Sequence, residues 1–211
     1  MAMLLHPASK PVLFAACMIP LAWLVYAAFS NMLGANPAEK LIRSTGDWTL
    51  RFLCLTLAVT PLRRLTKQSA LLRFRRMLGV FTYCYACLHF LCYSWLDMGW
   101  VLNDILRDIA KRPFILVGTS AFLLMTPLAL TSFNYFIRAM GGRRWQLLHR
   151  TIYGIVLLGL LHFFWMRSGK QDFAEVAIYA LIIVVLLGSR VLTTYQTYRA
   201  RYSLSNGMSS R

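Results

Sequence analysis

The sequence is poor in charged residues, and poorest in acidic ones. Only 14% of its 211 residues are charged, and 58% are hydrophobic, whereas about 25% of a typical soluble domain is charged. Seven residues are Asp or Glu and 23 are Lys or Arg, so the formal net charge is +16. Long apolar runs recur along the whole chain. This composition excludes an ordinary soluble domain and indicates a protein that crosses a membrane several times.

The sequence also lacks the motifs of soluble redox domains. It contains no G-x-G-x-x-G stretch and no P-loop, and it has no soluble segment to carry one. Electrons used by such a protein must come from a separate protein, a lipid quinone or a flavin. The five cysteines all lie in apolar runs, and the C-x-x-C at Cys84–Cys87 has no second thiolate pair for zinc. We therefore interpret the cysteines as small buried hydrophobic residues, without a disulfide framework.

Six apolar segments are each near the roughly 20 residues that a membrane-spanning helix needs. They are roughly Val12–Phe29, Thr45–Leu62, Met77–Leu96, Phe114–Thr131, Leu147–Trp165 and Phe173–Leu192. The second is the weakest, because it is short and contains Arg51, which must pair or reach the interface. The sequence predicts an all-α, polytopic integral membrane bundle of six transmembrane helices, with residues 1–211 forming a single transmembrane domain.

The distribution of charge predicts the orientation of these helices. The segments Pro61–Arg76 and Ser132–Arg150 contain many basic residues and no acidic one, and the segment from Arg190 onwards is also basic. All seven acidic residues lie in or beside the alternate loops. The positive-inside rule then places both termini in the cytoplasm. The positive charge is a topology signal, so we expect no nucleic-acid partner, although some arginines are suited to anionic lipid head groups.

Two histidines fall at similar depths in different predicted helices. With this orientation His89 lies 12 residues into the third segment, about 18 Å across a core of about 30 Å. His162 lies 15 residues into the fifth segment, so both imidazoles belong to the outer half of the membrane. Buried imidazoles suit the axial positions of a haem iron, but hydrogen bonds between helices would satisfy them equally well. From spacing alone, the two interpretations are evenly matched.

Other residues near these histidines have weaker signals. Gly159, one turn before His162, and Gly154 would let a flat macrocycle approach the backbone, although small residues equally allow close helix packing. His149 is expected near the cytoplasmic edge, where it either serves an electron input, with or without a second haem, or is simply solvated. On an ideal helix His149 and His162 point about 140° apart, so one straight stripe does not hold both.

Several stretches together resemble the MsrQ family, also called YedZ. In order they are LGANPAEKLIRSTG, TLAVTPLRRL, RRMLGVFTYCYACLHFLCY, KRPFILVG, PLALTSFNYFIRAMGGRRWQLLHRTIYG and LHFFW, and they run from about Leu33 to Trp165. This family is part of the ferric-reductase-like transmembrane group, which includes NADPH oxidases. The resemblance implies a haem b membrane subunit of a bacterial system that repairs methionine sulfoxide in periplasmic proteins.

The resemblance also implies a site and partners. His89, His149 and His162 would be associated with one or two haems b. Arg75 stands where oxidase relatives have a fourth histidine, and is either a partner of a haem propionate or an ordinary positive-inside arginine. The partner would be MsrP, a periplasmic molybdopterin reductase, and the donor the quinone pool or a cytosolic flavin reductase. FMN is associated with the family, but no motif in the chain indicates its site.

We therefore expect a cytochrome b of the bacterial inner membrane that relays electrons outward to MsrP. It would have no catalytic pocket for methionine sulfoxide itself. One alternative is a ferric or other metal reductase of the same transmembrane group. Another, of a different class, is a non-redox six-helix transporter, for which acidic or paired ionisable residues would be expected at mid-membrane.

Overall fold

The computed structural model describes residues 6–169 and 171–209, and within them all regular structure is helical. The elements are α2 (Ser9–Phe29), α3 (Pro37–Thr66), the 3₁₀ turn η1 (Ser69–Leu71), α4 (Leu72–Cys92), the π-helical turn η2 (Tyr93–Asp97), α5 (Leu102–Lys111), α6 (Pro113–Leu130), α7 (Asn134–Met140), α8 (Gly142–His149), α9 (Ile152–Ser168) and α10 (Ala174–Ser209). The expectation of an all-α chain is confirmed.

Five helical stretches of the described residues are long and apolar enough to cross a membrane. They are Ser9–Phe29, Ser69–Asp97, Pro113–Leu130, Gly142–Ser168 and Ala174–Arg199. The second predicted segment lies inside α3, which has 30 residues but a much less apolar composition than α2 or α6. The count of six crossings, which needs α3 to span the bilayer, therefore stays a prediction.

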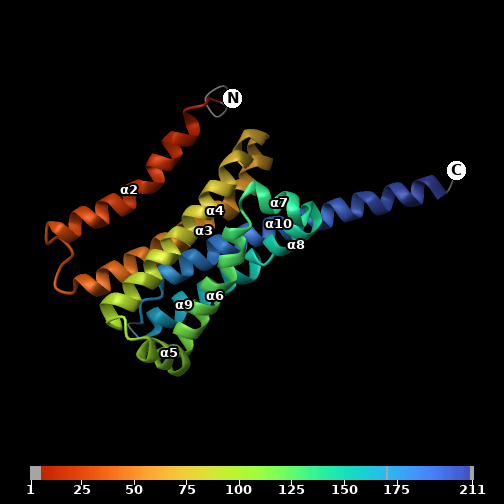
Figure 1. Cartoon of the computed structure of the whole chain (residues 1–211). Helices are drawn as coiled ribbons and strands as arrows, with labels where there is room; N and C mark the ends of the chain where they lie inside the picture. Colours follow the sequence, from red (N-terminus) through yellow and green to blue (C-terminus); the bar gives the residue numbers. More distant parts are fainter. Residues whose placement is uncertain (1–5, 170, 210–211) are drawn as a thin grey trace.

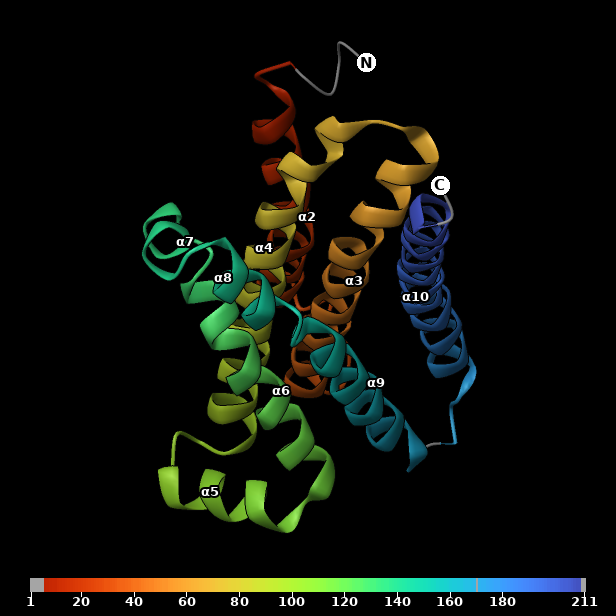
Figure 2. The same ribbon diagram turned by 90° about the vertical axis from the view of Figure 1, so that its right-hand side faces the viewer.

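The helices α3, α4, α6 and α9 lie side by side, and α5 lies across one end of this bundle (Figures 1 and 2). The C-terminal part of α10 extends away from the bundle (Figure 1). One apolar core joins α3, α9 and α10 through residues such as Leu57, Val156 and Ile183. A second joins α2, α3 and α4 around Phe52 and Tyr85. A third joins α4, α6 and α9. The helices that carry His89 and His162, α4 and α9, are therefore both fixed by contacts with α3 and α6.

The fifth predicted segment is not one continuous helix. The chain turns at Arg150 and Thr151, between α8 and α9. At this break the Thr151 hydroxyl donates to the Leu148 carbonyl at 2.8 Å, and the indole of Trp145 donates to the Thr131 carbonyl at 2.9 Å. The angle between His149 and His162 expected for one ideal helix therefore does not apply, because the two residues belong to different helices.

Local sequence explains how α3 begins. The Asn36 side chain accepts from the Glu39 backbone N–H at 3.1 Å, and Pro37 occupies the first helical turn. An Asn cap followed by proline is a strong start signal, because both satisfy the exposed first turn of a helix. The sequence analysis placed this helix eight residues later, since it followed hydrophobicity alone.

Two arginines lie within helices and bind across the bundle. The Nε of Arg51 donates to the Tyr179 hydroxyl at 3.1 Å, and its guanidinium lies 4.6 Å from the centre of the Trp48 ring. Arg51 therefore pairs, as expected. Arg190, which the sequence analysis assigned to a cytoplasmic segment, lies in α10 and donates to the Leu57 carbonyl and the Tyr153 hydroxyl.

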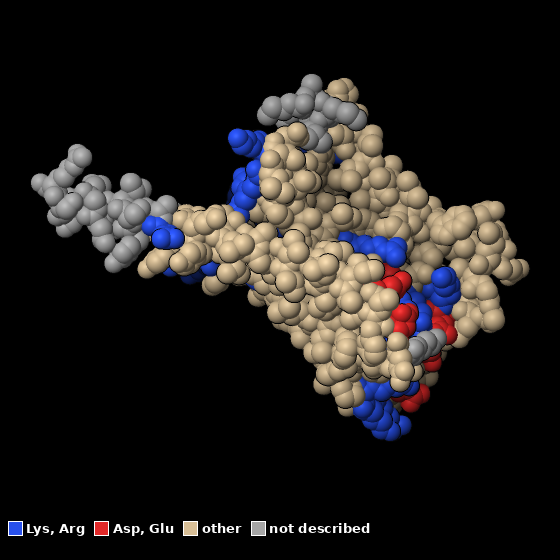
Figure 3. All heavy atoms as spheres, turned by 180° about the vertical axis from the view of Figure 1, so that it is seen from behind, with Lys and Arg blue, Asp and Glu red and all other residues tan. Residues whose placement is uncertain are grey.

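Charge is distributed unevenly over the surface. On the face shown in Figure 3, acidic side chains gather at one end only, where basic side chains lie beside them, while the charged side chains toward the other end are basic. The start of α2 and the end of α10 lie toward the end of the bundle opposite α5 (Figure 2). All five cysteines are free, but only Cys17 and Cys54 are buried, whereas Cys84 is exposed and Cys87 and Cys92 are partly exposed. The expectation that the cysteines are buried is therefore wrong for three of the five.

Candidate haem-binding site

The structure brings His89 of α4 and His162 of α9 close together inside the bundle, with the two rings nearly perpendicular. Their ring centroids are 6.2 Å apart and their planes make an angle of 74°. Both imidazoles line a cavity of about 480 Å³. The similar depths expected from the sequence therefore correspond to a close pair.

A backbone carbonyl fixes each imidazole. The Nδ1 of His89 lies 2.8 Å from the carbonyl oxygen of Ile42 on α3, and the Nδ1 of His162 lies 2.6 Å from that of Phe114 on α6. Because a carbonyl oxygen only accepts, each Nδ1 must carry the proton and donate it. Each Nε2 is then left with a lone pair, which is the arrangement found when a histidine ligates a metal and its second nitrogen is held by the protein.

A glycine follows each of these carbonyls by four residues and lies under the imidazole. A Cβ added to Gly46 would lie 3.0 Å from Cε1 of His89, and one added to Gly118 would lie 2.7 Å from Nδ1 of His162. These positions therefore need glycine, because a side chain would displace the ring. The sequence analysis missed both residues, although each is the single glycine within its long helix, α3 or α6, which was a signal.

The glycines that the sequence analysis favoured have other surroundings. Gly159 lines the main cavity, and a Cβ there would meet nothing within 4 Å. It therefore contributes open space beside His162, in agreement with the expectation. Gly154 is not among the residues that line this cavity, and a Cβ there would also meet nothing within 4 Å.

The lining of the cavity is mostly apolar, with charged side chains toward one end, its mouth. Apolar residues of the lining include Leu50, Phe122, Met125 and Ile155. The charged residues of the lining are Glu39, Arg43 and Asp47 of α3, Asp97 at the end of η2, and Arg112 directly before α6. A cavity of this size, mostly apolar with a few polar groups, is typical of a site for a cofactor.

The donor set and its spacing fit a haem. An imidazole nitrogen binds a metal at about 2 Å, so two imidazoles on opposite sides of one metal have centroids about 6 Å apart, close to the 6.2 Å observed. Among the described residues no group of three or more His, Cys, Asp or Glu side chains gathers around a possible metal ion. A porphyrin supplies four nitrogen ligands of its own, so two histidines suffice.

His149 lies apart from this pair, at the end of α8. Its Nδ1 lies 3.1 Å from the Trp145 carbonyl oxygen, and its ring stacks on the Trp145 ring with centroids 3.9 Å apart. It lines a separate cavity of about 60 Å³, which is much smaller than a porphyrin. Arg75 lies in the first turn of α4. A second haem and a role of Arg75 as partner of a haem propionate both stay predictions.

Comparison with known proteins agrees with this geometry. A sequence model of the ferric reductase like transmembrane component family matches residues 45–160, which include both His89 and His149. Together with the five apolar helices, this match makes the chain a multi-pass membrane protein of the ferric-reductase-like class. No solved structure matches the chain at a significant level.

Curated relatives carry the identification further. A protein of Polaromonas naphthalenivorans is 64% identical over 95% of this chain and 91% of its own length. Proteins of Ralstonia nicotianae and Herminiimonas arsenicoxydans are 55% and 51% identical over 82% and 89% of this chain, and over 80% and 86% of their own lengths. Each is named "Protein-methionine-sulfoxide reductase heme-binding subunit MsrQ". The chain belongs to the MsrQ family, as its sequence motifs predicted.

Proposed function

We propose that this chain is the haem-binding, electron-transferring subunit of a bacterial methionine sulfoxide reductase system. The observation that carries the proposal is the His89–His162 pair, with its 6.2 Å separation and its two Nδ1 groups held by carbonyls. The names of the relatives, which describe haem-binding subunits of such a reductase, support the same function.

The side chains of the site have distinct roles in this proposal. His89 and His162 would hold the haem iron through their Nε2 lone pairs. The carbonyls of Ile42 and Phe114 hold the imidazoles in one orientation, while Gly46 and Gly118 make room for the rings. The haem supplies one-electron redox chemistry. The apolar lining keeps water away from the site, which favours electron transfer over side reactions.

We infer that the haem lies toward the periplasmic face of the bacterial inner membrane. In this arrangement α3 also crosses the membrane, which brings the number of crossings to six, and both chain ends are cytoplasmic. The support is the positive-inside pattern, because the basic segments Pro61–Arg76 and Ser132–Arg150 lie at or beyond the ends of α3 and α6, whereas the cavity mouth lies near the starts of these helices. Electrons would leave at this mouth for a periplasmic molybdopterin reductase, MsrP.

We propose His149 as the place where electrons enter from the inner side. The donor would be the quinone pool or a cytosolic flavin reductase. A haem near the outer face leaves most of a core of about 30 Å uncrossed. His149, on the far side of Leu53 and Met125 from the pair, is the histidine best placed to shorten that distance. A quinol that diffuses within the bilayer would depend on it less.

The test is the optical spectrum and haem content of purified variants. His89→Ala and His162→Ala should each remove the same low-spin b-type component and lower the haem-to-protein ratio, whereas His149→Ala should retain that component. If His89→Ala and His162→Ala lose different components, the pairing is wrong. With His149→Ala, reduction by the flavin donor should slow more than reduction by quinol. Equal rates with both donors would place the electron input elsewhere.

A second candidate function is reduction of external ferric iron by the same site. The match to the ferric reductase like family favours it. The two candidates differ in the acceptor, so oxidation of the reduced protein by ferric chelates and by the periplasmic methionine sulfoxide reductase should be compared. Faster oxidation by the reductase supports the first function, and faster oxidation by the chelate supports the second.

A further inference from the structure

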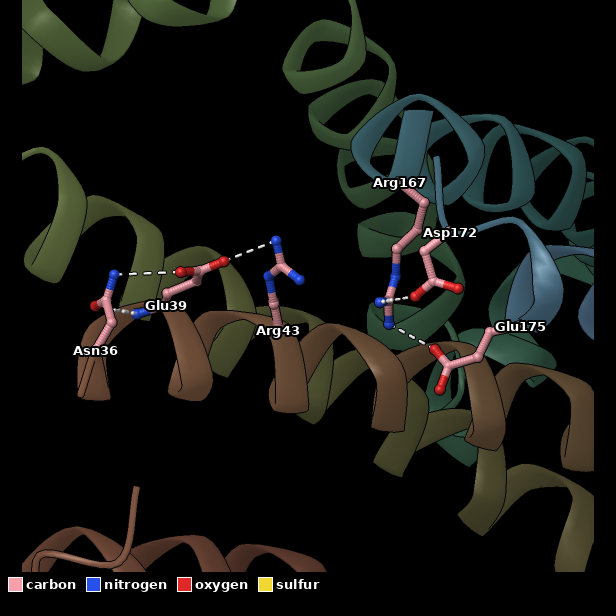
Figure 4. A network of polar contacts seen from close by, with 6 residues as sticks. All are labelled: Asn36, Glu39, Arg43, Arg167, Asp172 and Glu175. Carbon is pink, nitrogen blue, oxygen red and sulfur yellow. Dashed lines mark hydrogen bonds and ion pairs between the residues drawn. The ribbon is translucent and has the colours of Figure 1, made fainter. Parts of the chain in front are cut away.

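Two arginines line the outer end of the haem cavity, and each pairs with a carboxylate. Arg43 pairs with Glu39 on α3 at 2.7 Å, and Arg112 pairs with Asp108 of α5, also at 2.7 Å. The first pair is shown in Figure 4 within the polar network at the start of α3. The two pairs differ in which partner is covered: Arg43 is 25% and Glu39 41% exposed, whereas Arg112 is 49% and Asp108 only 12% exposed.

Asp108 connects three parts of the site. One carboxylate oxygen accepts from the Tyr93 hydroxyl at 2.7 Å, and the other pairs with the Nε of Arg112. Tyr93 is buried and lies one turn after His89, where α4 passes into the π-helical turn. Arg112 comes directly before α6, the helix whose Phe114 carbonyl holds His162. Through Tyr93 and Arg112, Asp108 therefore fixes the end of α4, which carries His89, and the start of α6, whose Phe114 carbonyl holds His162.

The pairing of Arg112 leaves most of its donors available. Asp108 uses the Nε of the guanidinium, whereas an arginine has five N–H donors in a rigid plane. Because Arg112 precedes Pro113, its backbone is extended, with φ −105° and ψ 106°. Backbone and carboxylate together restrict the guanidinium to the mouth of the cavity that it lines.

The chemistry of this position points to a carboxylate ligand. A haem carries two carboxylates on one edge of an otherwise apolar ring. A guanidinium binds a carboxylate more strongly than a neutral donor does, and with a fixed direction. A haem whose apolar ring lies among the apolar side chains, and whose carboxylate-bearing edge lies at the charged mouth, matches both parts of the cavity lining.

We propose that Arg112 binds a carboxylate of the haem held between His89 and His162, and that Asp108 is the positioning residue that fixes Arg112 for this contact. This inference rests on the proposed function of the same site. It adds the residues that select the orientation of the porphyrin and recognise its free carboxylates.

The test compares two porphyrins in the full-length protein purified from haem-deficient cells. Haem b and its dimethyl ester, which lacks the negative charges, are titrated separately, and the Soret change gives each dissociation constant. The wild type should bind haem b about tenfold or more tightly than the ester, because a charge-assisted hydrogen bond is lost with the ester. Arg112→Gln should remove most of this preference, mainly by weakening the binding of haem b.

A double-mutant cycle separates positioning from folding. Asp108→Ala should reduce the preference for haem b in the wild-type background and change it little in the Arg112→Gln background. If Asp108→Ala does not fold, Tyr93→Phe, which removes one anchor of Asp108, should give a smaller change in the same direction. The matched control is the Asp104–Arg107 pair of the same helix, which is exposed and 4.0 Å apart. Arg107→Gln should leave the preference unchanged.

The outcomes distinguish this inference from the proposed function. Equal binding of the two porphyrins by the wild type, or an equal loss for both in Arg112→Gln, overturns the role of Arg112. If Asp108→Ala reduces the preference for haem b as much in the Arg112→Gln background as in the wild type, the positioning role of Asp108 is overturned. A wild-type protein that binds neither porphyrin overturns the proposed function, and this inference with it.

Discussion

Each imidazole of the candidate site depends on two residues of a neighbouring helix. The carbonyls of Ile42 and Phe114 orient the rings, and the glycines four residues later leave room for them. Four residues is slightly more than one helical turn, so the carbonyl and the glycine Cα lie on the same face of the helix. The same local solution occurs on α3 and on α6, one for each histidine.

The glycines give a prediction at this scale. Gly118→Ala places a methyl group 2.7 Å from the His162 ring, so the ring must move away from the Phe114 carbonyl. We expect loss of most of the low-spin haem component, measured as the haem-to-protein ratio and the Soret spectrum. Gly46→Ala, with 3.0 Å to His89, should have a weaker effect of the same kind.

Gly154→Ala is the matched control, because Gly154 lies on α9 with His162 and a Cβ there meets nothing within 4 Å. Its haem content should equal that of the wild type. Full haem content in Gly118→Ala would contradict the close packing of His162 against α6.

At the scale of elements, the end of α9 and the start of α10 are joined by an arginine whose side chain is largely covered. The guanidinium of Arg167 pairs with Asp172 at 3.0 Å and with Glu175 at 2.5 Å, across the turn between the helices (Figure 4). It also lies 5.3 Å from the centre of the Phe163 ring. The Arg167 side chain is only 12% exposed, although its partners are about half exposed. Arg167 therefore closes the hairpin beside the mouth of the haem cavity.

Removal of this arginine should loosen the hairpin. For Arg167→Ala we expect a loss of about 1–2 kcal/mol, since the partners remain solvated and the ion pairs are partly screened. Thermal unfolding in detergent, compared with the wild type, measures the change. Arg107→Ala is the control, because its side chain is 73% exposed and its partner is 4.0 Å away. A melting temperature of Arg167→Ala equal to that of the control would show that the ion pairs contribute nothing.

At the scale of the whole molecule, the charges and the helices agree on an orientation. Acidic residues gather at one end of the bundle, and the helix ends near the two termini lie toward the other. With an even number of crossings, both chain ends would lie on the same side of the membrane. This is consistent with α3 as a sixth crossing, despite its polar composition.

Reporter fusions test this topology. A reporter that is active only in the periplasm should be silent when fused after Arg211 and active when inserted between Trp100 and Val101, before α5. Each fusion needs an expression control, for example a cytoplasm-active reporter at the same position. Periplasmic activity after Arg211 would reverse the assignment of the haem to the outer side.

The sequence by itself determined the class of the protein and most of its helices. Apolar length is a local property, so it predicted the all-α structure, the membrane and the long apolar helices, whereas the count of six crossings stays a prediction. The motifs from Leu33 to Trp165 identified the MsrQ family. His89 and His162 were also found from the sequence, because helix rise converts position in a segment into depth.

Only the tertiary structure decided how the helices face one another. The 6.2 Å separation of His89 and His162, the carbonyls that orient them and the bond from Arg190 to Leu57 all join residues distant in sequence. Such contacts depend on the rotation of each helix about its axis and on its packing partner, which a periodic pattern does not specify. The break at Arg150 likewise depends on the anchoring of Trp145 to the end of α6, and it separates His149 from the helix of His162.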